Sequence, residues 1–314
     1  MLCGGLGVVY FSLVESLWFV FYTHKRPGRP GADTDYQRID VPIIVFVVEE
    51  DAAAIAVDAE SDGLDPAAYQ LSGLQHYWKS KHADDLASLD ILLTLALVAW
   101  VNDVSVGRVH PKSAQTDQFT HAGDRRGDAV AITHNFLEAD KPGEYLASLL
   151  PQHHYYRGLK TALARYRAIA ANGGWPTIAE TGSTLHPGDQ DERVPQIRKR
   201  LAVTGELTDK ELNSDLYNET LQTAVEKFQL FHGLTPDGLA GAQTISQMNV
   251  SVDYRIRQIE MNLERWRWLD HDLGSSYILV DIASFDVQGV IDDKAAIEMR
   301  AIVGKAHHET PLFS

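Results

Sequence analysis

Residues 221–250 read Leu-Gln-Thr-Ala-Val-Glu-Lys-Phe-Gln-Leu-Phe-His-Gly-Leu-Thr-Pro-Asp-Gly-Leu-Ala-Gly-Ala-Gln-Thr-Ile-Ser-Gln-Met-Asn-Val, and this stretch decides the fold of its part of the chain. Apolar side chains recur in it at the spacing of one helix face, at Leu221, Ala224, Val225 and Phe228. Asn218 before this run and Gly233 after it are typical of the two ends of a helix. Asp237-Gly238 then predicts a turn, and Gly241 precedes a short helix that carries Ile245 and Met248.

A third helix is predicted upstream of this stretch. Its apolar positions are Val194, Ile197 and Leu201, and Gly205 ends it. Together the three helices predict a separate module over residues 183–250, which is marginal in size but large enough to bury a core.

The preceding residues, 60–180, predict an all-helical domain. Residues 84–104 are apolar nearly all round and end at Gly107, which favours a central core helix. Residues 144–171 predict two more helices broken at Pro151, and Asp65-Pro66 has the residues of a helix start.

The period of the apolar residues changes late in the chain. Residues 254–269 predict a helix with one apolar face, at Ile256, Ile259, Leu263 and Trp266. Residues 277–282 and 285–291 then predict two strands, and a hairpin turn at residues 292–294 leads to a third. The expected fold class is therefore α+β, mainly α. The expected segments are 1–59 (of unassigned character), 60–180, 183–250, a linker helix over 251–275, and the start of a β-rich domain over 276–314.

Composition excludes some classes of function. The net charge of -15 argues against nucleic acid or an anionic membrane as a partner, because both need a basic patch. The single cysteine, Cys3, excludes an internal disulfide framework and a cysteine-based zinc site. Residues 4–22 are largely apolar but lack the charge order of a signal peptide. They leave three interpretations open: an amphipathic or buried helix, a non-standard export or anchor segment, or an unnatural start.

The ordered residues of the module carry a resemblance. They are Leu185, Pro187, Gly188, Arg193, Val194, Ile197, Arg198, Arg200, Leu201, Tyr217, Ala224, Val225, Phe228, Gln229, Gly233, Leu234, Asp237, Gly238, Gly241, Thr244, Asn249 and Val250. In this order and spacing, residues 183–250 resemble the peptidoglycan-binding module of many bacterial wall enzymes. Peptidoglycan stem peptides and glycan are the partners that this resemblance implies.

Three other segments are similar to the large, scaffold-containing murein L,D-transpeptidases. Residues 255–269 look like their linker helix, and residues 299–305 and 310–314 look like the start of their catalytic domain. Residues 62–180 are similar to their helical scaffold domain, notably at residues 62–66, 107–109 and 173–176. The resemblance implies a periplasmic or cell-envelope location and a role in murein cross-linking.

Enzymes of that family use a cysteine thiolate to attack a stem peptide, with a histidine as base. Their Ser-His-Gly-Cys-x-Arg motif does not occur in this sequence, so no catalytic residue is assigned and the chain as given is expected to be inactive. Two alternatives stay open: a fragment of an active L,D-transpeptidase that forms 3–3 cross-links, and a non-catalytic scaffold for wall-synthesis partners.

The candidate peptidoglycan-binding residues are polar, are expected to be partly exposed and lie near the predicted turn: Gln229, Asp237, Thr244 and Asn249. Each has a structural interpretation beside the functional one, because turns and helix ends use the same residue types. No cofactor and no metal site are expected. Adjacent histidines, as in His153-His154 and His307-His308, point to different faces and rarely chelate one ion together.

Overall fold

The computed structural model describes residues 11–12, 18–19, 59–69, 77, 80, 82–109, 129–208, 211–281, 284–292 and 294–304. These residues are mostly helical, with a three-stranded antiparallel sheet late in the chain, so the predicted α+β, mainly α, class is confirmed. The chain divides into two compact units. Unit 1 comprises residues 1–157, 263–273 and 311–314, and unit 2 comprises residues 158–262 and 274–310.

The core of unit 1 is built on one long helix, α3 (Ala83–Val106), which Gly107 ends with a φ of 84°. Leu93, Leu97 and Trp100 are buried along it, as expected for a central core helix. Among the described helices, α3 alone has the length and apolar composition that could cross a membrane. Half of its most apolar segment is buried inside the protein. Its burial is that of a core helix.

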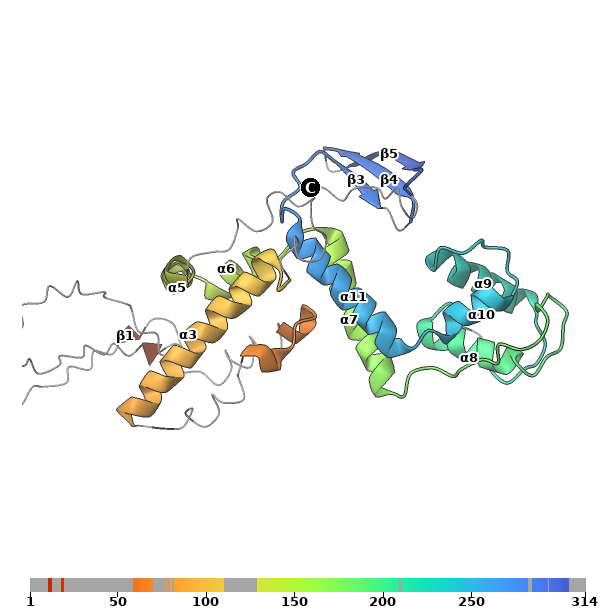
Figure 1. Cartoon of the computed structure of the whole chain (residues 1–314), viewed down its shortest axis with the longest axis horizontal. Coiled ribbons are helices and arrows are strands. Elements are labelled where there is room, and N and C mark those ends of the chain that lie inside the picture. The colour runs from red at the N-terminus through yellow and green to blue at the C-terminus, as the bar shows by residue number, and fades with distance from the viewer. Residues whose placement is uncertain are drawn as a thin grey trace, which may run out of the picture. The chain divides into compact units, whose positions relative to one another are not determined.

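Shorter helices pack against this core (Figure 1). They are η1 (Pro66–Tyr69), α5 (Ala129–Glu138) and α6 (Pro142–Ser148). The predicted start at Asp65-Pro66 is confirmed, because the Ala67 amide donates to Asp65 Oδ1 at 3.0 Å. α5 was not predicted from the sequence, and its described side chains contact the core through Ile132 and Phe136, which are buried, and Leu137, which is partly buried.

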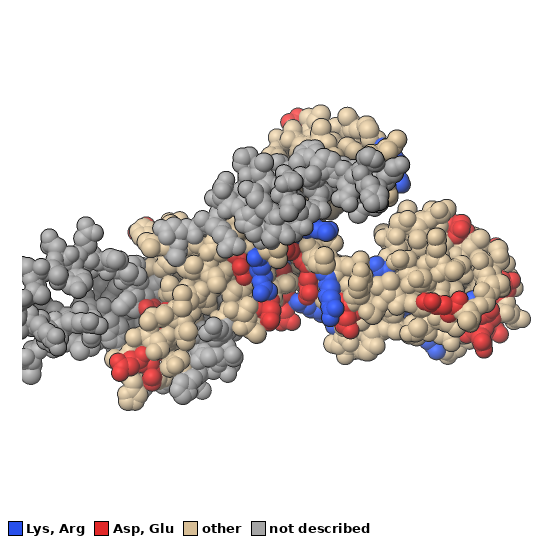
Figure 2. Space-filling view, in the orientation of Figure 1, with Lys and Arg blue, Asp and Glu red and all other residues tan. Residues whose placement is uncertain are grey.

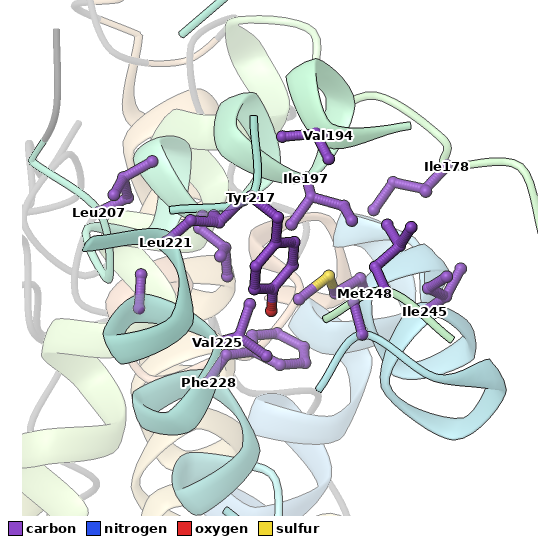
Figure 3. Packing of buried hydrophobic residues seen from close by; sticks show 14 residues of the cluster. Ile178, Val194, Ile197, Leu207, Tyr217, Leu221, Val225, Phe228, Ile245 and Met248 are labelled. Carbon is purple, nitrogen blue, oxygen red and sulfur yellow. The ribbon is translucent and has the colours of Figure 1, made fainter. Parts of the chain in front are cut away.

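In unit 2 the three predicted helices are confirmed as α8 (Val194–Thr204), α9 (Glu219–Phe231) and α10 (Ala242–Asn249). Figure 3 shows their shared core, with the Tyr217 ring among Ile197, Val225 and Met248. Asn218 caps α9 by accepting from the Leu221 amide at 3.0 Å, as predicted.

Two further helices contribute residues to both units. They are α7 (His154–Ala171) and α11 (Val252–Trp268), which lie side by side in Figure 1. Within unit 2, Arg167 pairs with Glu260 across them at 2.8 Å. On the predicted apolar face of α11, Leu263 is buried and Ile256, Ile259 and Trp266 are half-buried. Arg267 and Trp268 are buried as well, and Arg267 joins a polar cluster inside unit 1.

The predicted strands form one sheet in the order β3 (Tyr277–Asp281), β4 (Asp286–Ile291) and β5 (Lys294–Arg300). The turn between β4 and β5 falls where the sequence predicts it, and Asp292 there has a φ of 51°. Every side chain of β5 is exposed.

Near the N-terminus, β1 (Phe11–Ser12) pairs antiparallel with β2 (Trp18–Phe19). A first helix over residues 4–22 does not fit these four residues, whose aromatic content favours strands. Cys3 and residues 307–308 and 310–314 lie outside the described residues.

Candidate functional site

One buried amide side chain, that of Gln229, holds the loop between α9 and α10 in place. Gln229 is 2% exposed, and its Nε2 lies 2.7 Å from Asp237 Oδ1, 3.0 Å from the Leu239 carbonyl oxygen and 3.1 Å from Thr244 Oγ1. Its Oε1 accepts from the Gly238 amide at 2.8 Å. One side chain therefore fixes the backbone of the loop on both sides of Gly238.

Asp237 completes the loop from the solvent side. Its Oδ1 also accepts from the Leu239 amide at 2.9 Å, while the residue as a whole is exposed. The Leu239 amide and then the Gln229 side chain lower the pKa of Asp237, because they hydrogen-bond to its charged form. The loop thus presents to solvent a carboxylate that is ionised at neutral pH and can accept hydrogen bonds from hydroxyl, amide or amine groups.

Gly238 is required by geometry at the centre of this loop. Its φ is 69°, and a Cβ there would lie 2.6 Å from Gln222 Cγ and 2.8 Å from Glu226 Oε1. The Tyr217 hydroxyl donates to the Gly238 carbonyl oxygen at 2.8 Å from inside the core. The turn predicted from Asp237-Gly238 is therefore anchored to α9 and to the module's core at once.

Asn249, the fourth candidate, lies apart from the loop network. Its Oδ1 accepts from the Ile178 amide at 2.8 Å, and its Nδ2 donates to the Ile178 carbonyl oxygen at 2.9 Å. Its Nδ2 also lies 3.1 Å from Glu180 Oε1. Asn249 therefore holds the segment that enters the module against the end of α10.

The structure brings together three of the four candidates, Gln229, Asp237 and Thr244. The expectation that all four are partly exposed is wrong for Gln229 and Thr244, which are 2% and 5% exposed. Gln229 follows Phe228 on the edge of the apolar face of α9, and its bonds to the loop compensate for its burial. Of the three, Asp237 is the one on the surface.

Three arginines around α8 that carry the resemblance are buried, which was not predicted from the sequence. Arg193 is 5% exposed and donates to Asp191 Oδ1 at 2.8 Å, and to the carbonyl oxygens of Thr181 and Ser183. Arg198 and Arg200 are fully buried. The signal was present in the sequence, because Arg198 is four residues after Val194 and Arg200 three after Ile197, beside the apolar face.

In the face shown in Figure 2, acidic side chains gather over the part formed by α8, α9 and α10 with their loops. The charge of this face agrees with the net charge of -15 for the chain.

In unit 1, His153 and His154, at the start of α7, belong to an aromatic cluster. The His153 ring stacks on Trp266 at 4.9 Å and lies 5.1 Å from Tyr155. Burial lowers the pKa of His153, since desolvation disfavours the imidazolium. The described residues contain no group of three His, Cys, Asp or Glu side chains that could hold a metal ion.

Comparison with known families divides the chain into two matched regions. Residues 50–163 match the family described as the scaffold domain, and residues 190–248 match the family described as a putative peptidoglycan binding domain. No curated protein matches the chain. The second region contains α8, α9, α10 and the Gln229-anchored loop, so the module is similar to known peptidoglycan-binding domains. This similarity supports peptidoglycan as a partner and an extracytoplasmic or cell-envelope location.

Proposed function

We propose that this protein binds peptidoglycan through residues 183–250 and acts in murein cross-linking as a member of the L,D-transpeptidase family. The observation that carries the proposal is the match of residues 190–248 to a peptidoglycan-binding domain. The scaffold-domain match over residues 50–163 supports the finer assignment, because both domains are found in L,D-transpeptidases. A periplasmic location follows from that role.

The proposed contact surface is the loop of residues 235–241. Asp237 is exposed and ionised, and it accepts hydrogen bonds from ligand hydroxyl, amide or amine groups. Gln229 and Thr244 act beneath it as positioning residues, because both are buried and bond to Leu239 or Asp237. Asn249 contributes by fixing residues 178–180 at the end of α10.

The test is co-sedimentation of the full chain with purified sacculi. We expect the protein to pellet with sacculi. The Asp237→Asn variant should bind about tenfold more weakly, because it keeps an acceptor for the turn but loses a charged hydrogen bond. The measurement is the bound fraction across a titration of sacculi at fixed ionic strength.

Asp215→Asn is the matched control, since Asp215 is exposed and lies in the same module. It removes the same charge outside the loop and should leave binding unchanged. A wild-type chain that stays in the supernatant at every sacculus concentration would refute peptidoglycan binding. Equal loss in both variants would show a general charge effect and remove Asp237 from the site.

A further inference from the structure

A second group of polar side chains in unit 2 lies around the fully buried Arg200 of α8. Arg200 Nε donates to the Met248 carbonyl oxygen at 2.9 Å, and Nη1 donates to Thr204 Oγ1 at 2.7 Å. Its Nη2 is buried and has no hydrogen-bond partner. Glu206 is reached only through the Thr204 hydroxyl, which bonds to its carboxylate.

Arg255 of α11 adds a second guanidinium to this group. It is half-buried, and its Nη2 donates to the carbonyl oxygen and the side-chain oxygen of Gln247, at 3.1 and 2.9 Å. Its Nε is buried without a partner. Among the described residues, no carboxylate lies within ion-pair distance of Arg200 or Arg255. The charge of Glu206 favours the protonated form of Arg200 without an ion pair, so the two guanidinium groups stay positively charged in a chain of net charge -15.

The positive charges of this group change the pKa of the neighbouring His232. Burial, with the positive charges of Arg255 and Arg200, lowers the pKa of His232 to about 4, so this histidine is neutral at physiological pH. Burial lowers the pKa of Arg200 to about 10, which leaves it protonated. Buried charges without a partner are unfavourable, and an anion that accepted the free N–H groups would remove this penalty.

Trp175 covers the inner guanidinium. The centre of its ring lies 3.8 Å from Arg200 Cζ, and its Nε1 donates to the Val250 carbonyl oxygen at 3.2 Å. Trp175 is half-buried and follows Gly173 and Gly174, which have φ values of 93° and 73°. These backbone angles favour glycine, so the two glycines set the turn that places the Trp175 ring. Arg255 and His232, also half-buried, form the side that solvent reaches.

We propose that Arg255, Arg200 and His232, with Trp175 above them, form an anion site that binds a free carboxylate of the peptidoglycan stem peptide. The inference rests on the proposed function and deepens it. The glycan backbone is uncharged, whereas the stem peptide carries free carboxylates. A guanidinium offers several N–H donors in one plane, which suits a carboxylate. Arg255 makes the first contact, and Arg200 supplies its free Nη2 behind it.

The test is a titration of the full chain with a soluble stem tripeptide, in which binding is measured by isothermal titration calorimetry and by tryptophan fluorescence. Two further titrations are made. One uses the same peptide with its carboxylates amidated, and the other uses free acetate. We expect the acid peptide to bind, and the amidated peptide to bind at least about tenfold more weakly, as for the loss of a charge-assisted hydrogen bond. Acetate at the same concentration should not compete, because it lacks the peptide's other contacts.

Arg255→Gln should weaken binding of the acid peptide by at least about tenfold and leave the amidated peptide unaffected. Arg257→Gln is the matched control, because Arg257 is exposed on the same helix. Equal binding by both variants and the wild type would overturn the site. If Arg255→Gln fails to fold, the affinities of the wild-type chain for the acid and the amidated peptide still test the proposal. Equal affinity for both peptides overturns it. Acetate that competes fully would show a general small-anion site instead.

Failure of this inference can be told apart from failure of the proposed function. A wild-type chain that sediments with sacculi but does not prefer the acid peptide would refute the anion site and leave peptidoglycan binding standing. A chain that binds neither sacculi nor either peptide would refute both.

Discussion

Arg267→Met is expected to destabilise unit 1 by about 3–5 kcal/mol, the usual effect of removing one member of a buried charged cluster. Arg267 is 1% exposed and donates to the backbone oxygen of Asp62 and, at 3.2 Å, to the Tyr156 hydroxyl. Tyr156 in turn donates to Asp62 Oδ1 at 2.9 Å, and both of these residues are buried. Methionine fills a similar volume but leaves these polar groups without their donor.

The cluster also reaches the loop after α3. Arg267 pairs with Glu264 at 3.1 Å, and Glu264 accepts from the Val109 amide at 2.8 Å. The residues that Arg267 connects are therefore far apart in sequence but all belong to unit 1. Its loss is expected to loosen the end of α11 together with the loop of residues 62–64.

The measurement is denaturant unfolding followed by two probes, because a chain with two units need not unfold in one step. The transition assigned to unit 1 should move to lower denaturant, and that of unit 2 should stay. Arg265→Gln is the control, since Arg265 is exposed on the same helix, and its expected effect is under about 0.5 kcal/mol. A shift below about 1 kcal/mol for Arg267→Met would show that the cluster contributes little.

Gln229→Leu is the second large effect that we expect, on both stability and binding. Leucine keeps the size of the side chain but removes the groups that face Asp237, Leu239 and Thr244, and the acceptor for Gly238. Buried polar groups left without partners cost about 1–3 kcal/mol each, so unit 2 should lose about 3 kcal/mol. Because the loop of residues 235–241 loses its anchor, sacculus binding should fall with it.

Gln243→Leu is the matched control, because it makes the same replacement at a position outside the loop. Gln243 is exposed on α10, so its replacement should leave both stability and sedimentation unchanged. Circular dichroism and thermal unfolding give the stability, and sedimentation is measured at a temperature where both variants remain folded. If Gln229→Leu lowers stability but leaves sacculus binding unchanged, the loop of residues 235–241 takes no part in peptidoglycan recognition.

Most helices of both units, though not α5, could be predicted because their signals are local. Asn218 and Gly205 mark helix ends by their side chains or their φ angles, and Leu221 to Phe228 mark a face by spacing alone. The hairpin at residues 292–294 was predictable for the same reason. These features depend on residues a few positions apart.

The polar interior could not be predicted in the same way. Arg200 meets Trp175 and Met248, and Arg267 meets Asp62 and Tyr156, over sequence separations that no periodic pattern reports. Gln229 was assigned to the correct loop but to the wrong degree of exposure. Its burial depends on four bonds that form only once the loop has closed over it.

Amide chemical-shift mapping of the full chain with soluble stem-peptide-bearing glycan fragments tests directly whether residues 183–250 bind peptidoglycan. We expect concentration-dependent shifts in the amides of Asp237 to Ala240, in the loop that Gln229 anchors, with the amides of α3 unchanged. Shifts confined to unit 1, or none within residues 183–250 at saturating ligand, would contradict such binding.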